Sequence, residues 1–210
     1  ICISDNAGTL EPEKIENPEI HVVKNKNLGG VGGFTRTMLE YLNGEEKISH
    51  VLLMDDDAII LPETIERNYL FLKHLKKKYY NYVFWNNGDM IAHNHDFDMT
   101  SLAECITNEV EIEHDYVGWW YSCIPVTFIN KNKLPLPLFI HRDDIEYGLR
   151  ANGEFILLNG ICVWHEAFEN KCPGTNEYYD IRNLAILNAI HDEKFTAKQF
   201  KKVLFKEISS

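Results

Sequence analysis

The stretch HVLLMDDDAII, residues 50–60, runs from an apolar segment directly into three consecutive aspartates and back into apolar sequence. The apolar residues predict a buried β-strand. Carboxylates placed side by side repel one another and raise one another's pKa, so the cluster needs a positive partner. In an open parallel sheet, ligands gather beyond the carboxyl ends of the strands. Because Asp55, Asp56 and Asp57 would stand at that end, the stretch predicts a ligand site on an α/β sheet.

Alternation along an extended chain sends Asp55 and Asp57 to one side and Asp56 to the other. Two converging carboxylates bind a divalent cation through hard oxygen ligands. The alternative is a solvated acidic turn, because short motifs often match by chance. The apolar residues on both sides of the aspartates disfavour an ordinary surface turn.

The surrounding sequence alternates short apolar runs with helical periodicity, which is the βαβ pattern of a parallel sheet. The predicted elements up to residue 90 are strands at 1–4, 21–24, 50–54 and 82–86 and helices at 32–44 and 62–79. Residues 93–117 are interpreted as an irregular segment or a lid. The later predicted elements are strands at 122–129, 154–158 and 161–165, a short helix at 143–151 and two helices from about residue 176 onward. The predicted fold class is α/β, with a mostly parallel sheet flanked by helices.

Composition excludes several classes of protein. The 210 residues carry 32 acidic and 21 basic side chains, for a formal net charge of -11, whereas a general nucleic-acid binder must neutralise phosphates. Five cysteines form no CxxC pair, which favours reduced thiols in a cytosolic protein. No apolar run approaches the ~20 residues of a membrane span, and no signal peptide is evident. The chain opens directly in strand-like sequence, so we expect it to be a piece of a longer protein.

A second motif, NKNLGGVGGFTR at 25–36, lies between a predicted strand and a predicted helix. Gly29, Gly30, Gly32 and Gly33 permit close backbone approach to a ligand, and a helix N-terminus favours a negative group such as a diphosphate. The motif is neither a P-loop nor the dinucleotide fingerprint. Taken alone it is also compatible with a flexible turn.

A second acidic cluster lies in FIHRDDIEYGLR, residues 139–150. Asp143, Asp144 and Glu146 stand at a predicted helix start, where carboxylates serve as caps or as a general base. His165 ends a predicted strand and is interpreted either as a structural histidine or as a metal ligand.

Two further motifs have both a structural and a binding interpretation. Trp119 and Trp120 suit the core, with at least one of them buried, or a carbohydrate platform, because sugar rings present apolar faces. In NEYYDIRN, residues 176–183, Arg182 would hold a diphosphate or pair with Glu177 or Asp180.

As a set, these motifs resemble one family. The ordered motifs are SDNAGT, NLGGVGGFTR, LLMDDDA, GWWYSCIP, LPLPLFIHRDDIEYGLR, VWHEAF and YYDIRN. Across about residues 1–185 the set resembles family 2 glycosyltransferases of the GT-A fold. Within that family it resembles the galactofuranosyltransferase branch that builds bacterial galactans, with rhamnosyltransferases as close relatives.

The resemblance implies a domain organisation. Residues 1–210 would form a single GT-A, Rossmann-like domain, with a nucleotide-sugar half at 1–90, an acceptor and catalytic half at 91–175 and C-terminal helices at 176–210. Family members begin with a strand and loop of the TYNR type, which the sequence lacks ahead of ICISDN, so the domain is expected to lack its first strand. The N-terminal β-domain and helical C-terminal extension of galactan polymerases are also absent from the sequence, which argues against processive polymerisation.

The resemblance also implies roles on the donor side. Asp5 would contact the uracil of a UDP-sugar. Asp55, Asp57 and His165 would bind Mn²⁺ or Mg²⁺. The remaining donor-site residues would be Asp56, close to the ribose or donor sugar, together with Asn27, Gly29, Gly30 and Arg182.

On the acceptor side, Asp144 would be the catalytic base. Asp143 and Glu146 would hold hydroxyl groups, and Trp119 and Trp120 would form the acceptor platform.

The function implied is a metal-dependent, inverting glycosyltransferase that transfers galactofuranose from UDP-galactofuranose to a cell-surface glycan or lipid-linked acceptor. Its location would be cytoplasmic, at the inner face of the membrane. The helix containing KQFKKVLFKEI, residues 198–208, would contact anionic lipid or simply pack. The alternatives are a rhamnosyltransferase using a dTDP-sugar, a domain that binds nucleotide and metal without turnover, and a metal-dependent phosphohydrolase. The glycine motif and the tryptophan pair argue against the last.

Overall fold

The computed structural model describes residues 1–45, 47–75, 90–93, 118–150, 161, 163–166 and 174–209. The chain divides into two compact units. Unit 1 comprises Ile1–Thr37, Pro135–Glu146 and Cys172–Ser210, and unit 2 comprises Met38–Leu134 and Tyr147–Lys171.

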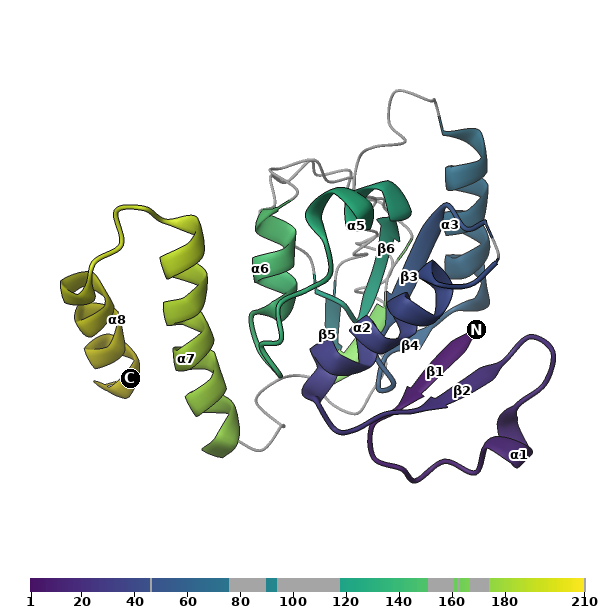
Figure 1. The fold of residues 1–210 in the computed structure, drawn as a ribbon, viewed down its shortest axis with the longest axis horizontal. Helices are drawn as coiled ribbons and strands as arrows, with labels where there is room; N and C mark the ends of the chain where they lie inside the picture. Colours follow the sequence, from purple (N-terminus) through teal and green to yellow (C-terminus); the bar gives the residue numbers. More distant parts are fainter. Residues whose placement is uncertain are drawn as a thin grey trace. The chain divides into compact units, whose positions relative to one another are not determined.

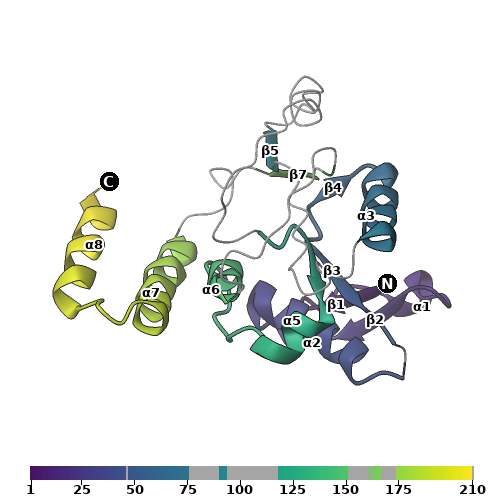
Figure 2. The same cartoon turned by 90° about the horizontal axis from the view of Figure 1, so that it is seen from above.

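Unit 1 is built on a pair of parallel strands, which lie side by side in Figures 1 and 2. Strand β1 (Cys2–Asp5) pairs with β2 (His21–Lys24) so that Asp5 lies opposite Lys24. The helices of this unit are α1 (Pro12–Ile15), most of α2 (Gly29–Leu42), the first turn of α6 (Asp143–Leu149), α7 (Gly174–His191) and α8 (Ala197–Ser209). Its buried apolar residues are Val22, Val23, Val31, Leu138 and Leu187.

Unit 2 contains two small sheets among its described residues. Strand β3 (His50–Met54) pairs antiparallel with β6 (Tyr121–Pro125), and the two strands are adjacent in both ribbon views (Figures 1 and 2). In the second sheet, β7 (Val163–Glu166) lies between β4 (Ile59–Ile60), which is antiparallel to it, and β5 (Met90–His93), which is parallel. The helices are α3 (Pro62–His74) and α5 (Val126–Asn132).

The core of unit 2 follows from the alternation along β3. Val51 and Leu53 are buried while Leu52 and Met54 are exposed, as a strand with one covered face requires. All five residues of β6 are buried, Cys123 among them. The other buried apolar side chains of this unit are Met38, Trp119, Phe128, Ile129, Tyr147, Ile161, Val163 and Trp164.

The predicted α/β class is confirmed, and the strands predicted at 1–4, 21–24 and 50–54 match β1, β2 and β3 to within one residue. The expectation of a mostly parallel sheet is not met among the described strands, because β3–β6 and β4–β7 are antiparallel. A continuous apolar run such as that of β6 has no periodicity that distinguishes the two arrangements.

The predicted strand 122–129 is wrong in its second half. Strand β6 stops at Pro125, which has no N–H to donate to a neighbouring strand, and Val126 begins helix α5. The helix predicted at 32–44 begins instead at Gly29, so the glycine motif lies inside α2 rather than in a loop before it. The helix predicted at 62–79 ends earlier, at His74, because the backbone of Leu75 is extended.

The strands predicted at 82–86 and 154–158 and nearly all of segment 93–117 lie outside the described residues. The single-domain organisation and the missing first strand stay predictions. Where the chain is described, no helix is both long enough and apolar enough to cross a membrane.

Candidate active site

The loop after β1 folds around the carboxylate of Asp5. Asp5 is buried, and its Oδ1 accepts hydrogen bonds from the N–H groups of Gly8 (2.7 Å) and Thr9 (3.3 Å) while Oδ2 accepts one from Leu10 (3.1 Å). Burial alone would raise the pKa of Asp5, but these backbone donors outweigh it and lower the pKa. The side chain predicted to contact uracil therefore also maintains the shape of its own loop.

Two asparagines join the loops that follow the parallel strands. Asn6 Nδ2 donates to the carbonyl oxygen of Gly29 (3.2 Å), and Asn25 Nδ2 donates to Asn6 Oδ1 (3.0 Å). Asn27 Oδ1 accepts from the N–H of Gly29 at 3.1 Å. The carboxyl ends of β1 and β2 and the start of α2 thus form one hydrogen-bonded unit. No role was predicted for Asn6 or Asn25, although Asn25 directly follows one predicted strand and Asn6 lies two residues beyond another.

The first two glycines of α2 differ in their surroundings. Gly29 has φ +76°, and a Cβ there would lie 1.8 Å from the carbonyl oxygen of Phe139. The close approach predicted for this motif is therefore, at Gly29, an approach to the chain's own backbone. A Cβ on Gly30 would meet nothing within 4 Å, so open space borders the first turn of α2.

The segment 138–142, which leads into α6, has an unusual backbone. Phe139, His141 and Arg142 have φ values of 74°, 64° and 62°, a left-handed conformation that residues other than glycine rarely adopt. Such strain persists only where surrounding contacts hold it. The residue types of FIHRDD give no sequence signal for it.

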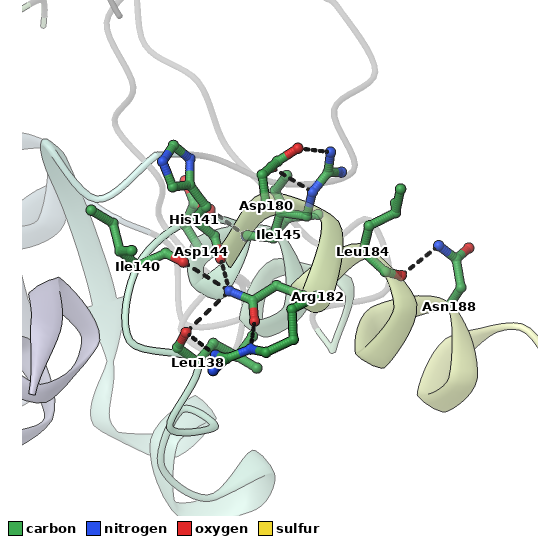
Figure 3. A network of polar contacts seen from close by, with 11 residues as sticks. Leu138, Ile140, His141, Asp144, Ile145, Asp180, Arg182, Leu184 and Asn188 are labelled. Carbon is green, nitrogen blue, oxygen red and sulfur yellow. Dashed lines mark hydrogen bonds and ion pairs between the residues drawn. The ribbon is translucent and has the colours of Figure 1, made fainter. Parts of the chain in front are cut away.

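Helix α7 supplies those contacts (Figure 3). Asn183 is fully buried, and its Nδ2 lies 3.1, 2.7 and 2.7 Å from the carbonyl oxygens of Leu138, Ile140 and His141. Arg182 donates from Nη2 to the carbonyl of Leu138 (2.6 Å) and from Nε to Asn183 Oδ1 (2.9 Å). Arg182 therefore bonds to the strained segment, in place of the pairing with Glu177 or Asp180 that was left open.

Asp180 pairs instead with Arg142. Their two hydrogen bonds, 2.7 Å from Nε and 2.8 Å from Nη2, form a bidentate ion pair that is partly buried. Aromatic contacts extend the same junction, because Phe139 stacks on Tyr179 at 4.7 Å between ring centroids. Through hydrogen bonds, an ion pair and a ring stack, the YYDIRN motif of α7 thus holds the segment that precedes the second acidic cluster.

The three carboxylates of that cluster have different environments. Burial raises the pKa of Asp143 to about 6, against the opposing effect of its own N–H and that of Asp144. Asp144 Oδ1 accepts the N–H of Ile145 at 2.7 Å. Glu146 is buried, and its Oε1 lies 3.0 Å from Nε2 of His191 on α7.

In unit 2, the three central aspartates form a turn between β3 and β4. The N–H of Ala58 donates to the carbonyl of Asp55 at 3.4 Å, and Asp55 is half-buried while Asp56 and Asp57 are exposed. The β4–β7 register places Ile59, which comes two residues after Asp57, opposite Trp164, the residue before His165.

The predicted metal ligands keep the status of a prediction. Among the residues the structure describes, no group of three or more His, Cys, Asp or Glu side chains is arranged to hold a metal ion. The side chain of His165 lies outside that described set.

Of the two tryptophans predicted to form the acceptor platform, one lies in the core. Trp119 is 3% exposed and meets the ring of Tyr147 edge to face at 5.8 Å between centroids, which confirms the expectation that one tryptophan is buried. Trp120 is partly buried against the cluster of Tyr121, Ile161 and Val163. A Cβ on Gly118 would lie 2.2 Å from the Trp120 ring, so the glycine of GWW makes room for that ring.

The predicted site residues divide into two groups, one in each unit. In unit 1 these are Asp5, Asn27, Gly29, Gly30, Asp143, Asp144, Glu146 and Arg182, and in unit 2 they are Asp55, Asp56, Asp57, Trp119 and Trp120, with the backbone of His165.

Comparison with known proteins supports the interpretation of the motifs. The chain is 28% identical, over 221 aligned residues, to the galactofuranosyltransferase GlfT2 of Mycolicibacterium smegmatis, which covers 89% of this chain and 34% of that protein. It is 29% identical over 199 residues to GlfT2 of Mycobacterium tuberculosis, and this alignment covers 79% of this chain and 31% of that protein. The chain spans about one third of the length of these relatives, and no family model matches it. Over most of its length the chain is similar to galactofuranosyltransferases, and the resemblance predicted from its motifs is confirmed.

Proposed function

We propose that this chain carries the catalytic part of a glycosyltransferase that transfers galactofuranose from UDP-galactofuranose to a glycan or lipid-linked acceptor. The observation that carries the proposal is the similarity, over 89% of the chain, to a protein named galactofuranosyltransferase. The joined loops after β1 and β2 support it, because ligands of α/β proteins bind at the carboxyl ends of parallel strands.

The proposed reaction is a single inverting displacement. The acceptor hydroxyl oxygen attacks the anomeric carbon, the bond from that carbon to the diphosphate oxygen breaks, and UDP leaves with the electron pair. Asp144 accepts the hydroxyl proton as general base. Asp143 is the alternative base, because burial raises its pKa to about 6, nearer to a working pH than an ordinary carboxyl.

The other acidic residue of this cluster has a different proposed part. Glu146 is buried and its Oε1 is bonded to His191, and in the proposed site it would hold hydroxyl groups of donor or acceptor. If Asp144 is the base, Asp143 holds hydroxyl groups of donor or acceptor.

On the donor side, Asp5 is proposed to shape the loop that meets uracil, because three backbone N–H groups already occupy its carboxylate. Asn27 aligns Gly29, and the open space at Gly30 leaves the first turn of α2 accessible to a diphosphate. Arg182 bonds to the Leu138 carbonyl, and in the proposed site its positive charge would favour the diphosphate of the donor.

Asp55, Asp57 and His165 would hold Mn²⁺ or Mg²⁺. Carboxylate oxygens with an imidazole nitrogen suit such ions by their chemistry, and the pairing of Ile59 with Trp164 sets the end of the aspartate turn opposite the residue before His165. A bound ion would neutralise charge on the departing diphosphate. Asp56, exposed between the two ligands, would face the ribose or donor sugar.

For the acceptor, the proposed platform rests chiefly on Trp120, since Trp119 is buried against Tyr147. The proposed location is the cytoplasmic face of the membrane. Helix α8 supports this, because Lys198, Lys201 and Lys202 are exposed on it and Phe205 is 68% exposed. Vesicles containing phosphatidylglycerol should bind the chain and phosphatidylcholine vesicles should not.

The function is tested by titrating the chain with UDP, UDP-galactofuranose and dTDP-rhamnose in a calorimeter, with and without Mn²⁺, and by following transfer to a lipid-linked galactan acceptor. We expect Mn²⁺-dependent binding of both uridine ligands, and a product whose anomeric configuration is inverted by NMR. Preference for dTDP-rhamnose would indicate the rhamnosyltransferase alternative. Donor binding without transfer would indicate a nucleotide-binding domain without turnover, and phosphate release without acceptor would indicate a hydrolase.

A further inference from the structure

The junction between α7 and segment 138–142 is built around one buried amide. An asparagine side chain has two N–H donors, and Asn183 directs its nitrogen at three carbonyl oxygens within 3.1 Å. Its own Oδ1 is occupied by Arg182. The nitrogen of this side chain is therefore directed wholly at a single stretch of backbone.

That stretch cannot hold its conformation unaided. Three of its residues, Phe139, His141 and Arg142, are left-handed without being glycine. Outside this segment, Lys133 is the other residue with such a φ among the described non-glycine residues. The strain and the buried amide coincide, which indicates that the contacts with α7 select this backbone conformation.

Segment 138–142 contacts the start of α2 and leads directly into α6. Its Phe139 carbonyl lies against Gly29, the first residue of α2. Its last residue, Arg142, accepts the first hydrogen bond of α6 from the N–H of Glu146 (2.9 Å), so Asp143 and Asp144 start from the backbone direction that Arg142 sets.

We propose that Asn183 is a positioning residue: it fixes segment 138–142 and thereby sets the direction of Asp143 and Asp144. The Arg142–Asp180 ion pair is a second fastening of the same segment. The catalytic consequence of this proposal rests on the proposed transferase function.

The chain provides a matched control on the same helix. Asn188 Nδ2 donates to the carbonyl of Leu184, one turn earlier in α7, at 2.7 Å, and within the described part of the chain it bonds there rather than to segment 138–142 (Figure 3). Asn183→Asp and Asn188→Asp make the same chemical change, replacing an amide by a carboxylate of equal size. Only the first places that carboxylate against three carbonyl oxygens of the strained segment.

The first measurement is hydrogen–deuterium exchange over residues 135–150. We expect Asn183→Asp to accelerate exchange of the Ile140 and Glu146 amides about tenfold or more, since these N–H groups bond within the segment and across it to Arg142. Asn188→Asp should leave both amides within about twofold of the unsubstituted chain. Equal behaviour of the two variants would overturn the proposal.

The second measurement separates positioning from general loss of structure. We expect Asn183→Asp to lower kcat about a hundredfold while the Kd for UDP-galactofuranose changes less than about threefold, because misplacement of a base affects the chemical step more than donor affinity. Parallel loss of kcat and donor affinity, or faster exchange with unchanged kcat, would contradict the positioning role.

If Asn183→Asp does not fold, as judged by circular dichroism, Asp180→Asn serves in its place. It removes one charge from the Arg142 ion pair and should give the same pattern at reduced size. If the unsubstituted chain transfers no sugar, the proposed function fails, and the exchange comparison still decides whether Asn183 fixes the segment.

Discussion

The side-chain amide of Asn6 lies 3.2 Å from the carbonyl oxygen of Gly29 and so joins the loop after β1 to the first residue of α2. Asn6 also accepts a hydrogen bond from Asn25, which comes directly after β2. One side chain thus fastens the ends of both parallel strands to the helix whose N-terminus would face a diphosphate.

Asn6→Ala should loosen that fastening. The variant leaves the Gly29 carbonyl and the Asn25 amide without this partner, so we expect a loss of about 1–2 kcal/mol in the free energy of unfolding. Weaker UDP binding should accompany it. Urea unfolding and calorimetry measure the two effects, with Asn43→Ala, at an exposed position near the end of α2, as the control. A variant as stable as the control would contradict the structural role of Asn6.

Gly29→Ala and Gly30→Ala form a pair with opposite expectations. At Gly29 the new methyl group would collide with the Phe139 carbonyl in a left-handed backbone, so we expect a loss of about 3 kcal/mol or more. At Gly30 the methyl group meets open space in a helix, so stability should stay equal or rise by up to about 1 kcal/mol.

The same pair tests the diphosphate site. If Gly30 lies against the donor, Gly30→Ala should lower the affinity for UDP without lowering the urea midpoint. Unchanged UDP affinity in a stable Gly30→Ala variant would remove Gly30 from the proposed site.

Asp143→Asn should have a pH-dependent effect on stability. The pKa of Asp143 is about 6 in the folded chain and 3.8 for an ordinary aspartate, so the folded state binds the proton more tightly than the unfolded state. The contribution of Asp143 to stability is therefore greatest below pH 3.8 and falls as the pH rises to about 6. The neutral asparagine avoids that loss.

We expect Asp143→Asn to be more stable than the unsubstituted chain by about 1–2 kcal/mol at pH 7.5 and nearly equal to it at pH 4. Urea unfolding at the two pH values provides the measurement. Glu193→Gln, at an exposed position, measures the general effect of removing one negative charge from a chain of net charge -11. An advantage that is the same at both pH values would contradict the raised pKa.

Asp57→Asn should weaken Mn²⁺ binding by about tenfold or more, because it removes one of the proposed carboxylate ligands. Electron paramagnetic resonance of free Mn²⁺ measures the affinity directly and does not require turnover. Glu193→Gln again serves as the control. Equal Mn²⁺ affinity in both variants would show that the aspartate turn is not the metal site.

The strands near the N-terminus were predictable because each is a short apolar run ended by polar residues. The position of Asp55, Asp56 and Asp57 after β3 followed from the same pattern. The antiparallel pairing of β3 with β6 did not, because pairing direction depends on contacts between residues about 70 positions apart along the chain.

Other parts of the site depend on contacts that no local pattern contains. The left-handed backbone at Phe139, His141 and Arg142 is held by Asn183, about 40 residues later. The sequence indicated that the acidic cluster and the YYDIRN motif were both important, but it did not indicate that the second holds the segment leading into the first.

The loop around Asp5 has a consequence for binding entropy. A flexible loop must lose conformational freedom when a ligand orders it, and that loss subtracts from affinity. The loop at residues 5–10 is already wrapped around its own carboxylate, whose lowered pKa keeps it ionised in mildly acidic solution. A nucleobase that binds to this loop would meet a preformed surface, so its association should carry little ordering penalty. Its affinity should also change little as the solution is acidified.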